Sequence, residues 1–270
     1  MTSAPGVPAT LPDPPLLEAA GLLLEVDGAV ATITLDKPGR RNSQTPRMWR
    51  ALAAIGAGLS AEVRVVVVRA NGASFSAGID TRLLTPEGLA GEESVHDLMR
   101  AADDAVLAAI DDYQRGFVWL SDPRFVTVAA VQGHAIGAGF QLALACDLRI
   151  VADDAGFMMK EPALGLVPDL AGTKPLVEVV GYPRALEICA TARTVMAEEA
   201  HELGLATLVV RRDELDAATS DLVEAILSNN PGAVRETKAL LQQAAANGLD
   251  EQRLAERRAQ LRRFRELAGG

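Results

Sequence analysis

The sequence predicts an α/β protein with a parallel sheet in its front part and helices in its final third. Two observations predict this fold class. Three short apolar runs rich in β-branched residues are typical of strands buried on both faces: RVVVVRA (64–70), FVTVAAVQG (125–133) and LRIVAD (148–153). The segments around them alternate between loop and helix, which is the pattern of parallel crossover units.

The remaining elements are predicted in order along the chain. LLLEVDGAVATITLD (22–36) predicts a hairpin that turns at Asp-Gly. Thr45 and Pro46 predict a helix to about residue 59, with Thr45 as N-cap and proline at the first helical position. Helix-like segments follow at 92–120, 134–147, 173–190, 197–205, 213–228, 231–246 and 250–267, with one more strand at about 207–210.

These elements divide the chain into a loose Pro-rich arm (1–18), an α/β core (19–205) and a C-terminal helical region (206–270). The arm lacks the basic region and apolar run of a secretory signal, and no apolar run reaches the ~18 residues of a membrane helix. We therefore expect a soluble cytoplasmic protein without a membrane partner.

Composition narrows the classes of function. With 49% hydrophobic and 23% charged residues, the 270-residue chain can bury a sizeable core. The formal net charge of −10 argues against non-specific nucleic-acid binding. Cys146 and Cys189 lie in apolar stretches without CxxC spacing, so neither a metal site nor a disulfide framework is expected.

Two glycine-containing loops follow predicted strands, at the end of the sheet where ligands bind in α/β proteins. SFSAGID follows the strand 64–70, and GHAIGAG follows the strand 125–133 and runs directly into a helix. Their small residues allow a ligand to approach the backbone, and the first amides of a helix are unpaired. Two such amides would form an oxyanion hole, worth roughly 3–4 kcal/mol per donor. The alternative is that the small residues only permit tight packing.

Four segments, taken together and in order, resemble the crotonase family of enoyl-CoA hydratases and isomerases: SFSAGID, VQGHAIGAGFQLALACDLRI, FMMKEPALGLVPDLAGT and AEEAHELGLATLVV. The resemblance runs over residues 22–267. It implies a spiral of ββα units with a C-terminal helical region, assembled as a homotrimer or a dimer of trimers. It also implies an acyl-CoA substrate of fatty-acid β-oxidation, whose thioester enolate is stabilised by two backbone amides. Coenzyme A is then part of the substrate, and no other cofactor is expected.

The resemblance assigns the oxyanion-hole amides to Ile79 and Ala138, each preceded by a glycine. It places the following residues along the substrate: Arg41, Ser43, Ser76, Gly78, Asp80 and Gly137. For Arg41 the alternative is a solvated surface charge. The last helix is basic, and its arginines either face solvent or meet the CoA phosphates across a subunit boundary: Arg257, Arg258, Arg262, Arg263 and Arg265.

The acid–base residues are predicted from KEPALGLVPDL (160–170). Enoyl-CoA hydratases hold a water with two glutamates, and the first position here is Gln141, which cannot transfer a proton, while the second is Glu161. The Lys-Glu pair followed by Asp169 resembles the branch that isomerises 3,5-dienoyl-CoA to 2,4-dienoyl-CoA, although a third acid of that branch is replaced by Gln141. In an apolar loop, desolvation and mutual repulsion would raise the pKa of both acids, as a base beside a thioester requires.

We therefore expect double-bond isomerisation, with Glu161 and Asp169 as proton carriers and Gln141 as a neutral positioning group. Two alternatives concern single residues, and two concern the activity. Glu161 could form a structural ion pair with Lys160 or an arginine, and Asp169 could be a helix N-cap or turn residue. The chain could be a 2-enoyl-CoA hydratase that uses Glu161 with Gln141 holding water, or a non-catalytic acyl-CoA-binding protein.

Overall fold

A six-stranded sheet forms the centre of the protein, whose computed structural model describes residues 10–269. The strand order is β1-β2-β3-β4-β6-β9, with β1 antiparallel to β2 and all other neighbours parallel. The strands are β1 (Leu22–Asp27), β2 (Val30–Leu35), β3 (Val65–Ala70), β4 (Val126–Val131), β6 (Leu148–Ala152) and β9 (Leu208–Val210). The predicted hairpin and all three predicted buried strands are present.

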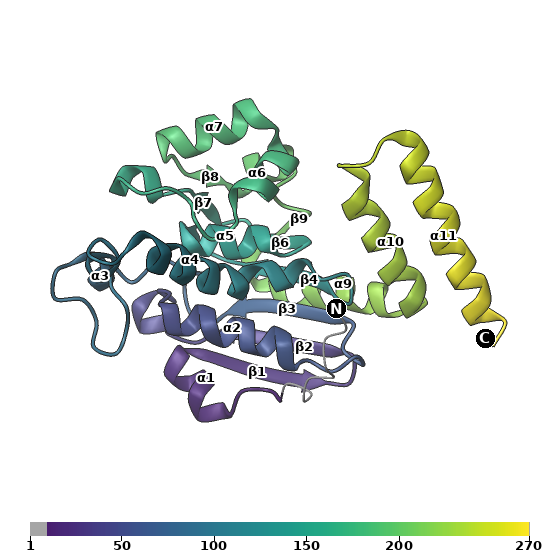
Figure 1. Ribbon diagram of the computed structural model, residues 1–270, viewed down its shortest axis with the longest axis horizontal. Coiled ribbons are helices and arrows are strands. Elements are labelled where there is room, and N and C mark those ends of the chain that lie inside the picture. Colours follow the sequence, from purple (N-terminus) through teal and green to yellow (C-terminus); the bar gives the residue numbers. More distant parts are fainter. Residues whose placement is uncertain (1–9, 270) are drawn as a thin grey trace.

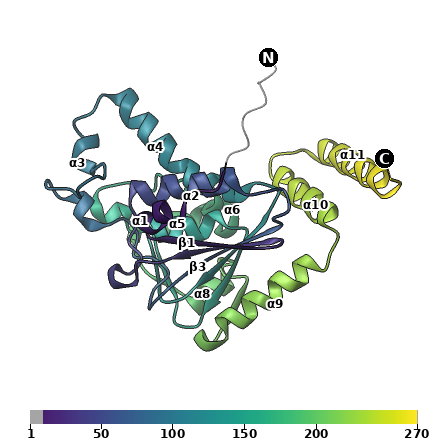
Figure 2. The ribbon, with the colours of Figure 1, turned by 90° about the horizontal axis from the view of Figure 1, so that it is seen from below.

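Both faces of the sheet are covered, which explains the continuous run of valines in β3. Val66 and Val68 pack into the large core under α1, α2, α4 and α5, whereas Val65 and Val67 pack with Leu215 of α9 on the other side. Figure 2 shows the sheet nearly edge-on between these two helical layers. Since side chains alternate across a strand, a strand with two buried faces needs apolar residues at every position.

A second, three-stranded sheet lies beyond the carboxyl ends of the main strands, in the order β5-β7-β8. It consists of β5 (His134–Ile136), β7 (Gly156–Met158) and β8 (Val195–Met196). The chain runs β4–β5–α5 and then β6–β7–α6, so each unit gives one strand to each sheet before its helix (Figure 1). This repeat confirms the expected spiral of ββα units.

The helices are α1 (Pro14–Ala20), α2 (Pro46–Gly58), α3 (Val95–Leu98), α4 (Asp103–Val118), α5 (Ala138–Ala145), α6 (Thr173–Val180), α7 (Tyr182–Thr191), α8 (Ala197–Glu202), α9 (Leu215–Leu227), α10 (Pro231–Ala244) and α11 (Leu249–Leu267). Within the described part of the chain, none of them is long and apolar enough to cross a membrane. Two predicted helices are each divided in two. The segment 92–120 forms α3 and α4, and 173–190 is interrupted at Gly181, whose φ of +74° ends α6.

The N-cap prediction at Thr45 is right in position and wrong in mechanism. Thr45 precedes α2 in an extended conformation, but within residues 10–269 its buried hydroxyl makes no hydrogen bond. The amide of Arg47 donates instead to the Glu92 carboxylate at 3.0 Å. An acid from the segment before α3 therefore caps this helix.

The ends of the chain differ from the expected division. Residues 1–9 of the expected arm lie outside the described residues, but residues 14–18 belong to helix α1, in which Leu17 is buried against the core. In the C-terminal region, β9 joins the main sheet and α9 packs on its face. Helices α10 and α11 stand apart from the body (Figure 1).

A buried lysine holds this C-terminal pair of helices to the core. The Lys238 ammonium group on α10 donates to the Asp147 carboxylate at 2.8 Å and to the carbonyl oxygens of Phe125 and Asp122 at 2.8 and 3.0 Å. All three donor positions of the ammonium group are therefore used. The contact joins α10 to the segments just before β4 and β6.

Candidate active site

The two glycine-containing loops lie side by side because a β-bridge joins them. Ser76 pairs with Ala135 in an isolated parallel bridge, with backbone hydrogen bonds of 2.8 and 2.9 Å between the loops. Counting three residues onward from each partner leads to Ile79 and Ala138. The register therefore brings both predicted oxyanion-hole positions to the same level, and both residues line one cavity.

The amide groups at these two positions are available. Ala138 is the first residue of α5, so its N–H has no acceptor within the helix. A second bridge, between Gln44 and Ile79, uses the Gly78 carbonyl and the Asp80 amide. Within residues 10–269, neither the Ile79 amide nor the Ala138 amide donates a hydrogen bond.

Two glycines with positive φ allow this close approach. A Cβ atom on Gly78 (φ +81°) would lie 2.5 Å from the carbonyl oxygen of Ile136 and 3.4 Å from the amide nitrogen of Ala138. A Cβ atom on Gly137 (φ +52°) would lie 3.2 Å from Oε1 of Glu161. The first glycine lets the loops touch, and the second leaves room for the carboxylate beside the second loop.

Glu161 begins a short 3-10 turn after β7 and lines the cavity. Its Oε1 accepts a hydrogen bond from Nε2 of Gln141 at 2.7 Å, while its buried Oε2 has no partner among the described residues. Burial raises the pKa of Glu161, and the charge of Asp169 raises it further. Within residues 10–269 neither carboxylate oxygen of Glu161 meets Lys160 or an arginine, so the structural ion-pair alternative is wrong.

Asp169 lines the same cavity, and burial raises the pKa of its carboxyl group. Its carbonyl oxygen accepts a hydrogen bond from Nε2 of Gln114 on α4 at 2.8 Å, which fixes the loop against that helix. The helix that follows has Gly172 as its N-cap residue, so Asp169 is not an N-cap.

Gln141 lies on α5 behind the cavity wall, with a side chain only 1% exposed. Its Nε2 donates to Glu161, and its Oε1 accepts hydrogen bonds from the amides of Leu170 at 2.9 Å and Gly172 at 3.2 Å. Both lone pairs of this oxygen are therefore occupied. One carboxamide holds the Glu161 carboxylate and the loop that carries Asp169 in fixed relative positions.

The cavity has a volume of about 440 Å³ and mostly apolar walls. Its larger apolar side chains come from α2, α3, α4, β5, the turn at 81–84 and the segment 164–170: Pro46, Trp49, Leu83, Val95, Leu98, Ile110, Ile136, Leu164, Leu166, Val167 and Leu170. Sequence reasoning did not find Glu93 and Tyr113, which also line it. They belong to the segment 81–125, which carries no motif.

The side chains of four expected substrate-binding residues, Arg41, Ser43, Ser76 and Asp80, do not line this cavity. The Ser76 hydroxyl makes three hydrogen bonds within the framework of the loops. Ser43 donates to Asp80 at 3.1 Å, and the hydrogen-bonded Arg82 guanidinium lowers the pKa of Asp80 to about 2. These residues hold the first loop in shape, whereas Arg41 is exposed just before them at a φ of +50°.

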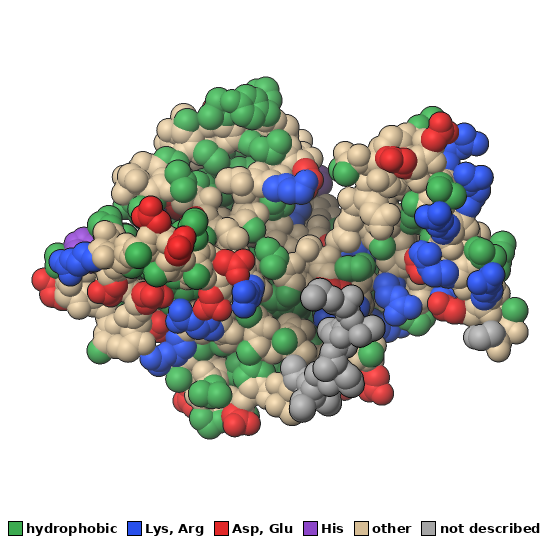
Figure 3. All heavy atoms as spheres, viewed as in Figure 1, with side chains coloured by type: hydrophobic (Ala, Val, Ile, Leu, Met, Phe, Trp, Pro, Cys, Tyr) green, Lys and Arg blue, Asp and Glu red, His purple; other side chains and the backbone are tan. Residues whose placement is uncertain are grey.

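Several Lys and Arg side chains gather over α10 and α11 (Figure 3). Arg262 forms an ion pair with Glu236 of α10 at 2.7 Å, and Arg263 is buried and donates to Asn230 at 2.9 Å. Both therefore stabilise the helical pair. The other three arginines named for this helix are exposed: Arg257, Arg258 and Arg265.

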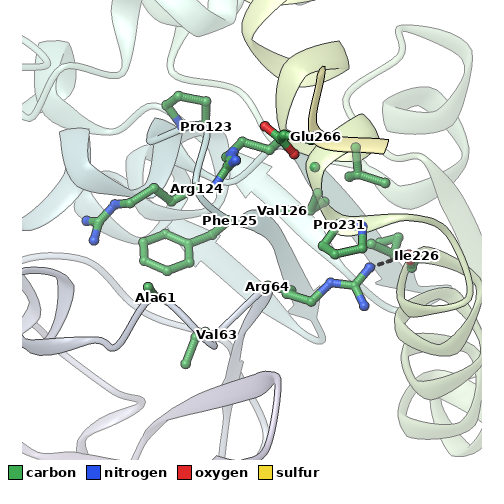
Figure 4. Close-up of a pocket in the computed structure, with 13 residues that line it drawn as sticks. Ala61, Val63, Arg64, Pro123, Arg124, Phe125, Val126, Ile226, Pro231 and Glu266 are labelled. Atoms are coloured by element: carbon green, nitrogen blue, oxygen red, sulfur yellow. Dashed lines mark hydrogen bonds between the residues drawn. The ribbon is translucent and has the colours of Figure 1, made fainter. Parts of the chain in front are cut away.

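A second cavity, of about 290 Å³, lies where α9 and α10 meet the core (Figure 4). Its central cation, Arg64, donates to the carbonyl oxygens of Leu227 at 3.1 Å and Asn229 at 2.7 Å. The guanidinium group thus satisfies the free carbonyls at the end of α9. This cavity therefore lies at the packing contact between the end of α9 and the core. Within residues 10–269 no cluster of His, Cys, Asp or Glu has the arrangement of a metal site.

A family model described as enoyl-CoA hydratase/isomerase matches residues 25–267 of the chain. The chain is similar to the mitochondrial Delta(3,5)-Delta(2,4)-dienoyl-CoA isomerase of Homo sapiens, at 34% identity over 77% of this chain and 64% of that protein. It is also similar to the short-chain-enoyl-CoA hydratase of Clostridium acetobutylicum, at 29% identity over 82% of this chain and 81% of that protein.

Among solved structures, the chain is similar to "a putative enoyl-CoA hydratase" from Thermobifida fusca YX in complex with CoA. The two chains share 51% identity, and the TM-score is 0.93 over 97% of this chain and 100% of the other. Relatives of both kinds, hydratase and isomerase, are thus similar to this sequence over most of its length.

Proposed function

Since the chain belongs to the enoyl-CoA hydratase/isomerase family, we propose that it moves double bonds in an unsaturated acyl-CoA, converting a 3,5-dienoyl-CoA to the conjugated 2,4-dienoyl-CoA. One observation supports this most directly. Two carboxyl groups of raised pKa line one apolar cavity, beside two backbone amides that donate no hydrogen bond among the described residues.

In the proposed reaction the thioester oxygen accepts hydrogen bonds from the Ile79 and Ala138 amides, which stabilise the negative charge that develops there. The free Oε2 of Glu161 removes a proton from C2. The resulting enolate extends over the diene, and the protonated carboxyl group of Asp169 gives a proton to C6. The double bonds then lie at C2 and C4, and the two acids exchange protons with solvent before the next turnover.

The raised pKa values suit both roles. Burial makes Glu161 a stronger base than an exposed carboxylate, and it favours the protonated form of Asp169 that must donate. The reaction moves two protons and no electrons, so its chemistry calls for no redox cofactor. Coenzyme A takes part only as a portion of the substrate.

The hydratase alternative requires two side chains that hold one water over the double bond. Gln141 does not line the cavity, and its carbonyl oxygen already accepts two backbone amides. These contacts favour isomerisation. Only the likeness to relatives named as hydratases supports hydration.

The test is to supply 3,5-dienoyl-CoA and follow the absorbance of the conjugated product. We expect the wild-type absorbance to rise, and Glu161→Gln and Asp169→Asn to lower kcat/KM at least about 100-fold, as removal of a general acid or base does. Glu198→Gln, on the exposed side of α8, is the matched control and should keep full activity. An unchanged rate for Glu161→Gln contradicts the assignment.

Isotopes distinguish the two reactions. In deuterated water the isomerase product gains deuterium on carbon and no oxygen, whereas a hydratase acting on 2-enoyl-CoA incorporates labelled oxygen from water. Labelled oxygen with no diene product would identify the chain as a hydratase. Tight acyl-CoA binding with neither product would identify a non-catalytic binding protein.

We further propose that the chain assembles as a homotrimer or a dimer of trimers, as its resemblance to the family implies. The separate α10–α11 pair supports an assembly, because it exposes large apolar side chains to solvent: Leu241, Leu249, Leu254, Leu261, Phe264 and Leu267. Light scattering after size-exclusion chromatography measures the mass directly. A monomer at micromolar concentration contradicts this part of the proposal.

A further inference from the structure

One section of the cavity wall is polar. Tyr113 of α4 and Glu93, just before α3, both line the cavity, and the Tyr113 hydroxyl donates a hydrogen bond to the Glu93 carboxylate. Tyr113 is only 3% exposed, and its ring packs against Trp49 with centroids 5.0 Å apart. Most other side chains of the wall are apolar, so this pair is a chemically distinct patch within it.

The position of this patch is fixed from outside the cavity. Arg50 of α2 donates to the Glu93 carboxylate at 3.3 Å, and Asp112 holds the same guanidinium at 2.6 Å. On α4, Gln114 follows Tyr113 and binds the backbone of Asp169. The polar patch therefore lies on the same helix that supports the Asp169 loop.

The patch offers hydrogen-bond acceptors and no donor. A carboxylate can only accept, and the phenol uses its one proton on Glu93, which leaves the lone pairs of its oxygen free. Burial and the neighbouring carboxylate raise the pKa of Tyr113, so the phenol keeps that proton. Lys160, the cation among the lining residues, is not part of this patch and belongs to the segment that carries Glu161.

An alkyl chain is a poor occupant for such a wall. Filling the cavity with methylene groups would remove water from the buried Tyr113 oxygen without replacing its hydrogen bonds, which is costly. The Glu93 side chain is 37% exposed and loses only the water on its cavity side. A hydroxyl group at this point would donate to either oxygen. A carboxylate would meet only acceptors and a like charge.

We infer that the acyl chain bound in this cavity carries a hydroxyl group beyond the reacting carbons, which donates to the Tyr113 oxygen or the Glu93 carboxylate. The inference rests on the proposed function, because it takes the cavity to hold the acyl chain of an acyl-CoA. It adds a substrate class, hydroxylated unsaturated acyl-CoA, and two residues that determine specificity.

The experiment uses saturated thioesters, which bind without reacting, so that its outcome does not depend on isomerisation. Calorimetry gives Kd for hexanoyl-, octanoyl- and decanoyl-CoA, and for the same chains with a terminal hydroxyl or a terminal carboxylate. At one chain length or more, we expect the hydroxyl compound to bind about fivefold tighter than the plain chain, as one added hydrogen bond gives. The carboxylate should bind more weakly than both.

Variants connect this preference to the patch. Tyr113→Phe and Glu93→Gln should each reduce the hydroxyl preference, and Glu93→Gln should also improve binding of the carboxylate. Tyr182→Phe changes the exposed second tyrosine of the chain and should change nothing. Glu93→Gln keeps a partner for Tyr113, so it tests the idea even if Tyr113→Phe folds poorly.

Three outcomes overturn the inference. Equal Kd values for plain and hydroxylated chains at every length show that the patch does not select. Equal weakening of all ligands by Tyr113→Phe shows that the contact only fastens the segment before α3 to α4. If no thioester binds at all, the proposed function fails as well, whereas in the first two cases it stands.

Discussion

Replacing Gln141 with methionine removes one carboxamide and leaves an unbranched side chain of similar length. The carboxamide makes three hydrogen bonds, of 2.7 Å to Glu161, 2.9 Å from Leu170 and 3.2 Å from Gly172. A bond to an ionised carboxylate contributes roughly 1.5–3 kcal/mol and a neutral one about 1 kcal/mol. We therefore expect Gln141→Met to lower the free energy of unfolding by about 4 kcal/mol.

The same substitution should lower activity. Without Gln141, the Glu161 carboxylate and the Asp169 loop are no longer held by a common group, and a displacement of about 1 Å in a reacting group costs roughly 100-fold in rate. Urea unfolding and kcat/KM for 3,5-dienoyl-CoA are measured at one protein concentration. Gln243→Met, on the exposed side of α10, is the matched control and should change stability by less than about 0.5 kcal/mol.

A second variant, Gln141→Glu, separates the acceptor from the donor. It keeps the bonds from the two amides but places a carboxylate about 2.7 Å from that of Glu161, where repulsion at an effective dielectric constant of 20 is about 6 kcal/mol. One of the two acids must keep a proton, so its pKa in the folded state is raised. The stability of Gln141→Glu should then be close to wild type at low pH and fall as pH rises.

For Gln141→Met, a loss in the free energy of unfolding below about 1 kcal/mol, with unchanged kcat/KM, refutes the role given to the Gln141 carboxamide.

Three further predictions concern other contacts. Gly137→Ala forces a side chain into a positive-φ position and against Glu161, so we expect a cost of roughly 1–3 kcal/mol and a clear loss of kcat/KM; wild-type kinetics would count against the packing described. Lys238→Met leaves the Asp147 carboxylate without its ion pair and should lower the free energy of unfolding by about 3 kcal/mol, whereas an unchanged urea midpoint would show that α10 is held by other contacts. Because the folded-state pKa of Glu161 is raised, its contribution to stability is lost as pH rises from the ordinary glutamate range through that raised value. Glu161→Gln should therefore gain in Tm relative to wild type as pH rises above the ordinary glutamate range, and a constant difference would contradict the raised pKa.

The main sheet could be predicted from the sequence because its strands are buried on both faces. Four consecutive valines, as in β3, predict a strand buried on both faces. The three strands of the small sheet were not predicted, since they are only two or three residues long. The sequence predicts residues 134–136 as part of a turn into a helix, because periodicity cannot be recognised over so few positions.

The motif-bearing part of the candidate site was accessible from the sequence, and the rest of its wall was not. Glu161 and Asp169 stand in a recognisable segment, and the structure places both in one cavity with Ile79 and Ala138. Glu93 and Tyr113 come from loop and helix residues whose approach depends on tertiary contacts. The helix break before α4 also has no strong local signal, since no proline or glycine occurs there.

The bridge between Ser76 and Ala135 fixes the two loops against each other. From this bridge, each loop runs three residues to its free amide. Inserting or deleting one residue in either stretch would separate the amides by a residue's length, about 3.3 Å, and no side-chain change could compensate. The segment from 81 to 102 is under no such constraint. Evolution, or an engineer, can lengthen, shorten or exchange it to suit a new acyl group while the anion-binding pair stays where it is.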